Sequence, residues 1–252
     1  MPVASSRRAR RPTSSHTDDV VRLLVTRPEG EASAAALRAR GHEVLLAPVL
    51  RIETLAAELG DGPWSALLLT SANAARAVAT HARRDALVSL PLFAVGRRTA
   101  AAAREAGFTD VTSADGDQRE LASLVAAQVK RGPLLYLAGE DRAGDLAGDL
   151  AKHGLATDIA VVYRAVALSA LPPAARQALE AGGLDGVLHY SRRSAESFMG
   201  CARSADLLGA ALAATHYCLS AEVAAPLSAA GARVRIAARP TESALIDLIG
   251  SA

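Results

Sequence analysis

The sequence of 252 residues contains only two cysteines, Cys201 and Cys218. They match no metal-binding spacing and no disulfide framework, so we expect free, buried thiols in a reducing cytosol. Aromatic residues make up 3% of the chain, so Leu, Val and Ala must form the core and helices must pack closely on sheets. No apolar run approaches the roughly 20 residues that a membrane-spanning helix requires.

Several common catalytic motifs are also missing. No GxGxxG follows the apolar run at 22–26, and neither GxxxxGK[ST], HExxH nor GxSxG occurs. These absences argue against a dinucleotide fold, a phosphate loop, a zinc protease and an esterase. The histidines are scattered without partners at catalytic spacing. We therefore expect no metal and no cofactor, and an enzyme built on this chain would depend on shape and backbone donors.

Charge is nearly balanced, with a formal net charge of +2. The first 20 residues carry a surplus of the same size, from Arg7, Arg8, Arg10 and Arg11 against Asp18 and Asp19. The rest is therefore near neutral, and we expect neither nucleic acid nor a membrane as a partner. Residues 1–20 lack the apolar core of a secretory signal, so we predict a disordered tail on a cytoplasmic protein.

From residue 20 onward, short aliphatic runs alternate with alanine-rich amphipathic stretches, several of them closed by glycine. This alternation is typical of an α/β protein with parallel sheets covered by helices on both faces. The predicted strands are 22–26, 44–53, 66–71, 92–96, 110–112, 134–139, 159–168, 186–191, 216–220 and 234–238.

The sequence also repeats itself, with the pieces out of order. The segments around 22–51, 66–78 and 92–108 resemble those around 134–164, 186–198 and 216–232. One domain interrupted by another explains this order. We predict a first domain at 21–50 plus 169–252 and an inserted domain at 54–165. Each would be flavodoxin-like with five parallel strands, and the linkers 49–54 and 163–168 would pair as a two-stranded β-ladder. Sequential packing of ten strands in one domain is the alternative.

Small polar residues follow several of the predicted strands. Backbone N–H groups at a helix start bind anions, and parallel sheets bind ligands at the carboxyl ends of their strands. Several such junctions facing one cleft would bind a compound with many carboxylates or phosphates. Helix capping alone is the alternative for each junction. The candidate residues are Thr70, Ser71 and Asn73, then Gly96 and Thr99, then Ser191 and Ser194, and finally Ser220.

Taken together, the motifs resemble the uroporphyrinogen-III synthase family. They are TRPEG (26–30), LLLTSANAARAV (67–78), VGRRTA (95–100), LYLAGEDR (135–142), VVYR (161–164), HYSRRSAESF (189–198) and RPTESALIDLI (239–249). The resemblance implies cyclisation of hydroxymethylbilane, a linear tetrapyrrole with eight carboxylates, to uroporphyrinogen III. Ring D is inverted and water is lost. It implies a cofactor-independent, monomeric lyase of porphyrin and heme biosynthesis, with the active cleft between two domains.

The resemblance also assigns roles to residues. Tyr163 matches the tyrosine that is thought to help the terminal hydroxyl depart, and Thr99 matches a threonine of the cleft. Arg27 follows the first strand and is expected to pair with a carboxylate. One departure is the sequence LSAEVAA at 219–225, where Glu222 would repel a substrate carboxylate if it pointed inward.

Two other functions remain open from the sequence. The first is a non-catalytic relative that holds a tetrapyrrole or another polyanion without turnover. The second is a sugar- or nucleotide-handling enzyme with two facing α/β domains, which would require a phosphate loop or an acidic metal pair that the sequence does not show.

Overall fold

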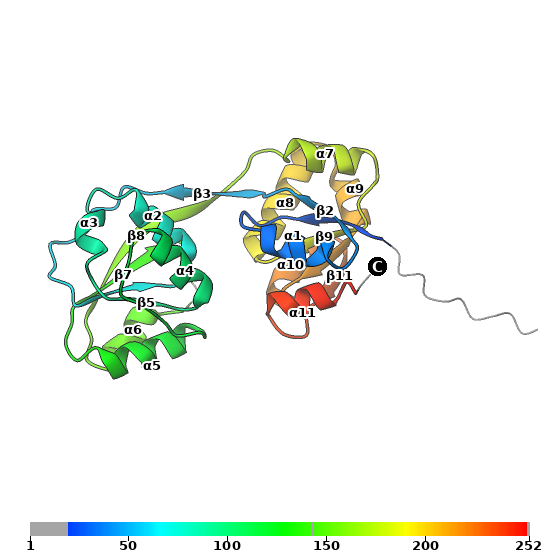
Figure 1. The fold of residues 1–252 in the computed structure, drawn as a ribbon. Helices are drawn as coiled ribbons and strands as arrows, with labels where there is room; N and C mark the ends of the chain where they lie inside the picture. Colours follow the sequence, from blue (N-terminus) through cyan, green and yellow to red (C-terminus); the bar gives the residue numbers. More distant parts are fainter. Residues whose placement is uncertain (1–19, 143, 251–252) are drawn as a thin grey trace, which may run out of the picture. The chain divides into compact units, whose positions relative to one another are not determined.

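The computed structural model describes residues 20–142 and 144–250, so the predicted disordered tail lies outside the described residues except for Val20. The chain divides into two compact units (Figure 1). Unit 1 comprises the chain up to Val49 and again from Leu168, and unit 2 comprises Leu50–Ala167. The chain therefore passes from one unit to the other twice.

Unit 1 contains a five-stranded parallel sheet with the order β11-β10-β9-β1-β2. Apolar residues of α1 and α11 pack on one face, and those of α8 and α10 on the other. The strands are β1 (Arg22–Val25), β2 (Glu43–Leu46), β9 (Gly186–His189), β10 (Thr215–Cys218) and β11 (Arg233–Ile236). The helices are α1 (Glu31–Arg38), α7 (Pro173–Glu180), α8 (Arg192–Ser204), α9 (Leu208–Ala213), α10 (Ala221–Ala229) and α11 (Glu242–Asp247).

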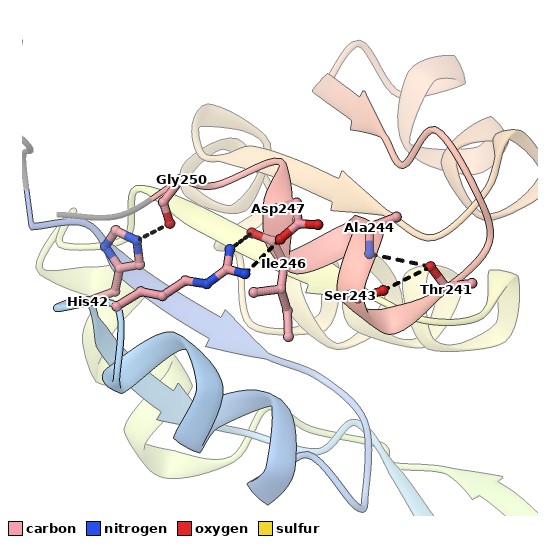
Figure 2. A network of polar contacts seen from close by, with 8 residues as sticks. His42, Thr241, Ser243, Ala244, Ile246, Asp247 and Gly250 are labelled. Carbon is pink, nitrogen blue, oxygen red and sulfur yellow. Dashed lines mark hydrogen bonds and ion pairs between the residues drawn. The ribbon is translucent and has the colours of Figure 1, made fainter.

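Two polar side chains between α1 and β2 hold the C-terminal segment, including α11, in place (Figure 2). The guanidinium of Arg40 donates to the Ile246 carbonyl at 3.0 Å and to the Asp247 carboxylate at 2.6 Å. The His42 ring contacts the Gly250 carbonyl at 3.2 Å. Because α11 is only six residues long, these contacts and its buried Leu245 and Ile246 must stabilise it.

Unit 2 contains a six-stranded sheet with the order β3-β8-β7-β4-β5-β6, parallel except for β3. Helices α2 and α4 cover one face, and α5 and α6 the other. The strands are β3 (Leu50–Thr54), β4 (Ala66–Leu69), β5 (Leu92–Ala94), β6 (Val111–Ser113), β7 (Leu134–Gly139) and β8 (Thr157–Ala167). The helices are α2 (Ala72–Ala79), α3 (Arg84–Leu87), α4 (Arg97–Glu105), α5 (Gln118–Gln128) and α6 (Leu146–Ala151).

Two details of the predicted fold were wrong. The run 44–53 is not one strand but two, β2 and β3, which belong to different sheets. Pro48 lies between them; backbone hydrogen bonds to the β1 segment continue through the N–H groups of Ala47 and Val49, and from Leu50 onward β3 pairs antiparallel with β8 instead. Unit 2 therefore has six strands rather than five parallel ones. The helix expected near 142–153 is also shorter and occupies Leu146–Ala151.

The out-of-order repeat is confirmed by the strand orders. Unit 1 reads β2-β1-β9-β10-β11, and unit 2 without its antiparallel edge strand reads β8-β7-β4-β5-β6. Strands β1 and β2 thus take the places of β7 and β8, while β9, β10 and β11 take those of β4, β5 and β6. The sequence similarity predicted the correspondences of β1, β2, β9 and β10, and the strand orders add that of β11 with β6.

Two buried histidines stack inside unit 1. The rings of His189 and His216 lie 5.1 Å apart, and both residues are completely buried. His216 Nε2 contacts the Ala211 carbonyl at 3.0 Å and therefore carries a proton, which leaves its Nδ1 to accept from His189 Nε2 at 2.9 Å. His189 Nδ1 is then a proton-free nitrogen without a partner in the described part of the chain. Burial lowers the pKa of His216 and lowers the pKa of His189 well below its usual range.

This histidine pair predicts a pH-dependent stability. Both rings are neutral in the folded chain, whereas the unfolded chain takes up protons below about pH 6.5, so the free energy of unfolding is highest above that pH and falls below it. At pH 5.5 the loss is about 1.4 kcal/mol for a ring that stays fully neutral in the folded chain, which is the upper limit for each of the two rings. Denaturant unfolding at several pH values measures this slope. The double replacement His189→Gln and His216→Gln should flatten it, whereas His153→Gln, at an exposed position, should not.

Candidate functional site

The carboxyl ends of β4 and β7 meet at the centre of the unit 2 sheet. The two strands pair in parallel, with Leu69 opposite Leu137. The chain leaves β4 through α2 toward β5, and it leaves β7 through α6 toward β8 on the opposite side. Loops that diverge in this way open a crevice above the sheet, which is where open α/β sheets bind ligands.

A cavity of about 360 Å³ lies at this point. Its walls come from the strand ends, the α5 start and the segment after β7. The lining residues are Thr70, Ser71, Val95, Asp117, Gln118, Tyr136, Gly139, Asp141, Arg142 and Tyr163. Three of the residues predicted from the sequence, Thr70, Ser71 and Tyr163, therefore line one cavity.

The hydroxyls at the end of β4 already have partners within unit 2. The Thr70 hydroxyl lies 2.8 Å from the phenol oxygen of Tyr136, whose side chain is buried. Ser71 is the N-cap of α2, and its Oγ accepts the Asn73 N–H at 3.1 Å. This capping bond fixes the Ser71 side chain at the cavity wall, and it leaves the Ser71 O–H able to donate.

Tyr163 lies half-buried beside these hydroxyls. Burial raises the pKa of its phenol, and the nearby Tyr136 and Asp141 add to the rise, while a hydrogen bond with the Ser71 side chain opposes it. The phenol therefore keeps its proton at neutral pH and is a hydrogen-bond donor there.

The other predicted residues of unit 2 lie away from this cavity. Asn73 uses its amide oxygen to accept from Arg76 at 3.0 Å. Gly96 is the N-cap of α4 and lines a separate hollow of about 420 Å³ with Arg97, Asp115 and Gly116. Gly96 has no side chain with which to cap α4. Thr99 is 6% exposed on the buried side of α4 and lines neither hollow.

The predicted serines of unit 1 cap helices. Ser191 begins α8, where its Oγ accepts the Ser194 N–H at 3.1 Å and its own N–H donates to Ser194 Oγ at 3.2 Å. The Ser194 hydroxyl also donates to the Ser191 carbonyl, and its side chain is buried. Ser220 begins α10 and accepts the Val223 N–H at 3.4 Å. Of the three, Ser191 is the most open to solvent.

At the carboxyl ends of β1 and β9, the place in unit 1 that matches the cavity of unit 2, charged residues of the chain pair with one another. The Arg27 guanidinium lies 4.6 Å from the centre of the Tyr190 ring and 3.4 Å from the Glu242 carboxylate. Ser33 donates to the same carboxylate. Arg27 thus pairs with a carboxylate of the chain itself, that of Glu242 at the start of α11.

Sequence reasoning missed several residues of the unit 2 cavity. Tyr136 was read as part of an apolar strand, and Gly139 and Arg142 were noted only as parts of a motif. Gln118 and Asp117 begin α5, a helix start that carried no distinguishing signal. The tyrosine hydroxyl inside an otherwise aliphatic strand was the one available clue to a polar cavity.

Within residues 20–142 and 144–250, no cluster of three or more His, Cys, Asp or Glu side chains has the geometry to hold a metal ion. In the same part of the chain, none of the helices has the length and apolar character needed to cross a bilayer. The polar residues of the cavity supply hydroxyls, an amide, one guanidinium and two carboxylates, a set that can form hydrogen bonds and donate protons.

Two solved structures are similar to this chain, and the first of them shares its fold. A uroporphyrinogen-III synthetase from Helicobacter pylori 26695 superposes with a TM-score of 0.62 at 18% identity, over 91% of this chain and 98% of that chain. A mutant uroporphyrinogen III synthase from Thermus thermophilus gives a TM-score of 0.48 at 20% identity, over 91% and 97%. No curated protein sequence matches the chain.

A family model gives the assignment. The model described as uroporphyrinogen-III synthase HemD matches residues 31–247, which include both sheets almost entirely. The match extends from α1 to the last residue of α11, so it covers every predicted site residue except Arg27, which precedes it. The chain belongs to the uroporphyrinogen-III synthase family.

Proposed function

We propose that the strand-end cavity of unit 2 carries out the proton-donating step of the uroporphyrinogen-III synthase reaction, with Tyr163 as the donor. The chain is a cofactor-independent cyclising enzyme of tetrapyrrole biosynthesis by its family. Its substrate is then hydroxymethylbilane, and its product is uroporphyrinogen III with ring D inverted. The observation that carries the assignment to residues is that Tyr163, Thr70 and Ser71 line one cavity at the sheet's switch point.

Loss of the terminal hydroxyl requires only a weak acid. The C–O bond of the terminal hydroxymethyl group breaks, and the oxygen leaves as water after it takes one proton. The electron-rich pyrrole supplies the electron pair that replaces the bond, which gives the azafulvene in its N-protonated, cationic form and leaves the proton donor as its anion. A protonated phenol held beside the hydroxyl is sufficient for this step. Burial raises the pKa of Tyr163, which keeps the phenol protonated through neutral pH.

Geometry decides which isomer forms. The azafulvene must meet ring D at its substituted carbon to give the spiro intermediate, from which a bond then migrates. Binding the flexible tetrapyrrole in one folded conformation favours that attack over simple end-to-end closure. We propose that Ser71, the backbone N–H groups at the α4 start beside Gly96, and the exposed Arg142 hold substrate carboxylates.

The proposal for unit 1 is narrower. Ser191 and Ser220 begin helices whose first turns attract carboxylates, and we propose them as further substrate contacts. For Arg27, a contact with substrate requires exchange of the Glu242 carboxylate for a substrate carboxylate. Ser194, Asn73 and Thr99 act in this proposal by holding the helix starts in place.

The proposal extends to the setting of the enzyme. We propose a cytoplasmic monomer that acts on a small molecule and binds neither nucleic acid nor membranes. The near-neutral charge of the chain supports this.

The first prediction concerns the product. Incubation of the protein with hydroxymethylbilane should give the type III isomer faster than the spontaneous formation of type I, as separated by chromatography after oxidation to the porphyrins. A chain that only binds the tetrapyrrole would give type I alone, which would contradict the proposed activity.

The second prediction concerns Tyr163. Its replacement in Tyr163→Phe keeps the ring and removes the proton donor, so kcat should fall about 10- to 100-fold while KM changes little. Steady-state kinetics with isomer analysis measures both constants. Tyr217→Phe, on a strand of unit 1, is the matched control and should keep the wild-type kcat. An unchanged kcat in Tyr163→Phe would remove the catalytic role of Tyr163 without removing the family assignment.

The third prediction concerns Ser71. Asp and Asn both cap helices well, so Ser71→Asp and Ser71→Asn differ mainly in charge. The added carboxylate should repel the substrate and raise KM at least about tenfold relative to the Asn variant, and salt should reduce the difference. Equal KM values in the two variants would mean that Ser71 is a helix cap and not a substrate contact.

A further inference from the structure

The pairing of β7 with β8 changes register just before Tyr163. Ala138 lies opposite Val161, yet the next residue, Gly139, lies opposite Tyr163 rather than Val162. Val162 is therefore an extra residue in β8, which makes this a β-bulge. The register returns to regular hydrogen bonding at once, because the Glu140 N–H donates to the Tyr163 carbonyl at 3.0 Å.

The bulge changes the face of the sheet from which Tyr163 projects. Side chains alternate along a strand, so Tyr163 in a regular strand would share the face of Val161 and Ile159. Instead, Tyr163 and Val162 both pack against the same core cluster, the one formed with α2 and α4. The extra residue thus moves the phenol to the α2 side, where Ser71 begins that helix.

The ring of Tyr163 then lies directly over Gly139. A Cβ atom on Gly139 would be 2.6 Å from Tyr163 Cζ and 2.7 Å from its hydroxyl oxygen. Both distances are far shorter than carbon contacts permit. The φ of Gly139 is outside the left-handed region, so the backbone itself would accept alanine. The glycine is therefore required by the ring above it rather than by its own conformation.

We propose that Gly139 and the bulge at Val162 together form a seat that sets the position of the Tyr163 hydroxyl in the cavity, and that Gly139 is a positioning residue for the reaction. The proposal rests on the proposed role of Tyr163. The seat acts in two ways: the bulge selects the α2 face, and the missing side chain lets the phenol lie flat on β7 beside Ser71.

A methyl group at position 139 should lift the hydroxyl end of the ring away from β7. The ring is attached to β8 and cannot slide along the strand, so it can only swing outward. A displacement of about 1 Å at a proton donor lowers turnover up to about a hundredfold. We expect kcat of Gly139→Ala to fall at least about tenfold, with a smaller change in KM. Gly200→Ala is the matched control, because a Cβ there meets nothing within 4 Å and α8 accepts alanine.

A double-mutant cycle separates positioning from a direct effect on substrate. In the Tyr163→Phe background the proton donor is already absent, so adding Gly139→Ala should lower kcat by less than about twofold. If the two losses simply multiply, the methyl group blocks the substrate or perturbs the sheet, and the seat proposal is overturned. If Tyr163→Phe alone has no effect, the proposed role of Tyr163 fails instead.

The ionisation of the phenol provides a readout that is independent of activity. The chain has four tyrosines, so the ultraviolet difference between a protein and its Tyr163→Phe partner isolates one phenol. Because burial raises the pKa of Tyr163, lifting the ring toward solvent in Gly139→Ala should lower that pKa toward its ordinary value. An unchanged titration in a folded Gly139→Ala protein would show that the ring has not moved and would overturn the proposal.

Discussion

The candidate site depends on the parallel pairing of β4 with β7 at the centre of the unit 2 sheet. Parallel pairing brings the carboxyl ends of both strands to one edge, so the Thr70-Ser71 pair and Gly139 become neighbours although about seventy residues separate them. The diverging connections leave that edge uncovered. Tyr163 projects from β8 toward this edge. Its half-buried phenol completes a cavity whose polar groups belong to four separate segments.

The matching places in the two units have different contents. In unit 2 the ends of β4 and β7 surround a cavity, whereas in unit 1 the ends of β1 and β9 lie beside the paired Arg27 and Glu242 and the Tyr190 ring. The repeated architecture therefore does not produce two equivalent sites. In unit 1 the Glu242 carboxylate of the chain itself balances the charge of Arg27.

The sequence predicted the fold well because most strands are short apolar runs that alternate with helices, and that pattern is visible with few aromatic residues. It failed at 44–53, where no helix separates β2 from β3 and only Pro48 marks the change of sheet. For the site, the hydroxyls after β4 and the VVYR tyrosine were visible as local features. The role of Gly139 was not visible, because it arises from a register shift and from the close approach of the Tyr163 ring, which leave no mark in either strand alone.

The order of the strands along the chain has a repeating pattern. Two strands are followed by three, and the same pattern of two and three then recurs: β1-β2 and β4-β5-β6, then β7-β8 and β9-β10-β11. Each sheet thus takes its pair of strands from one repeat and its three other parallel strands from the other repeat, an order that a tandem duplication with an exchange of partners would produce. During synthesis the sheet of unit 1 remains incomplete until β9 follows the whole of unit 2, because β9 is the strand that pairs with β1.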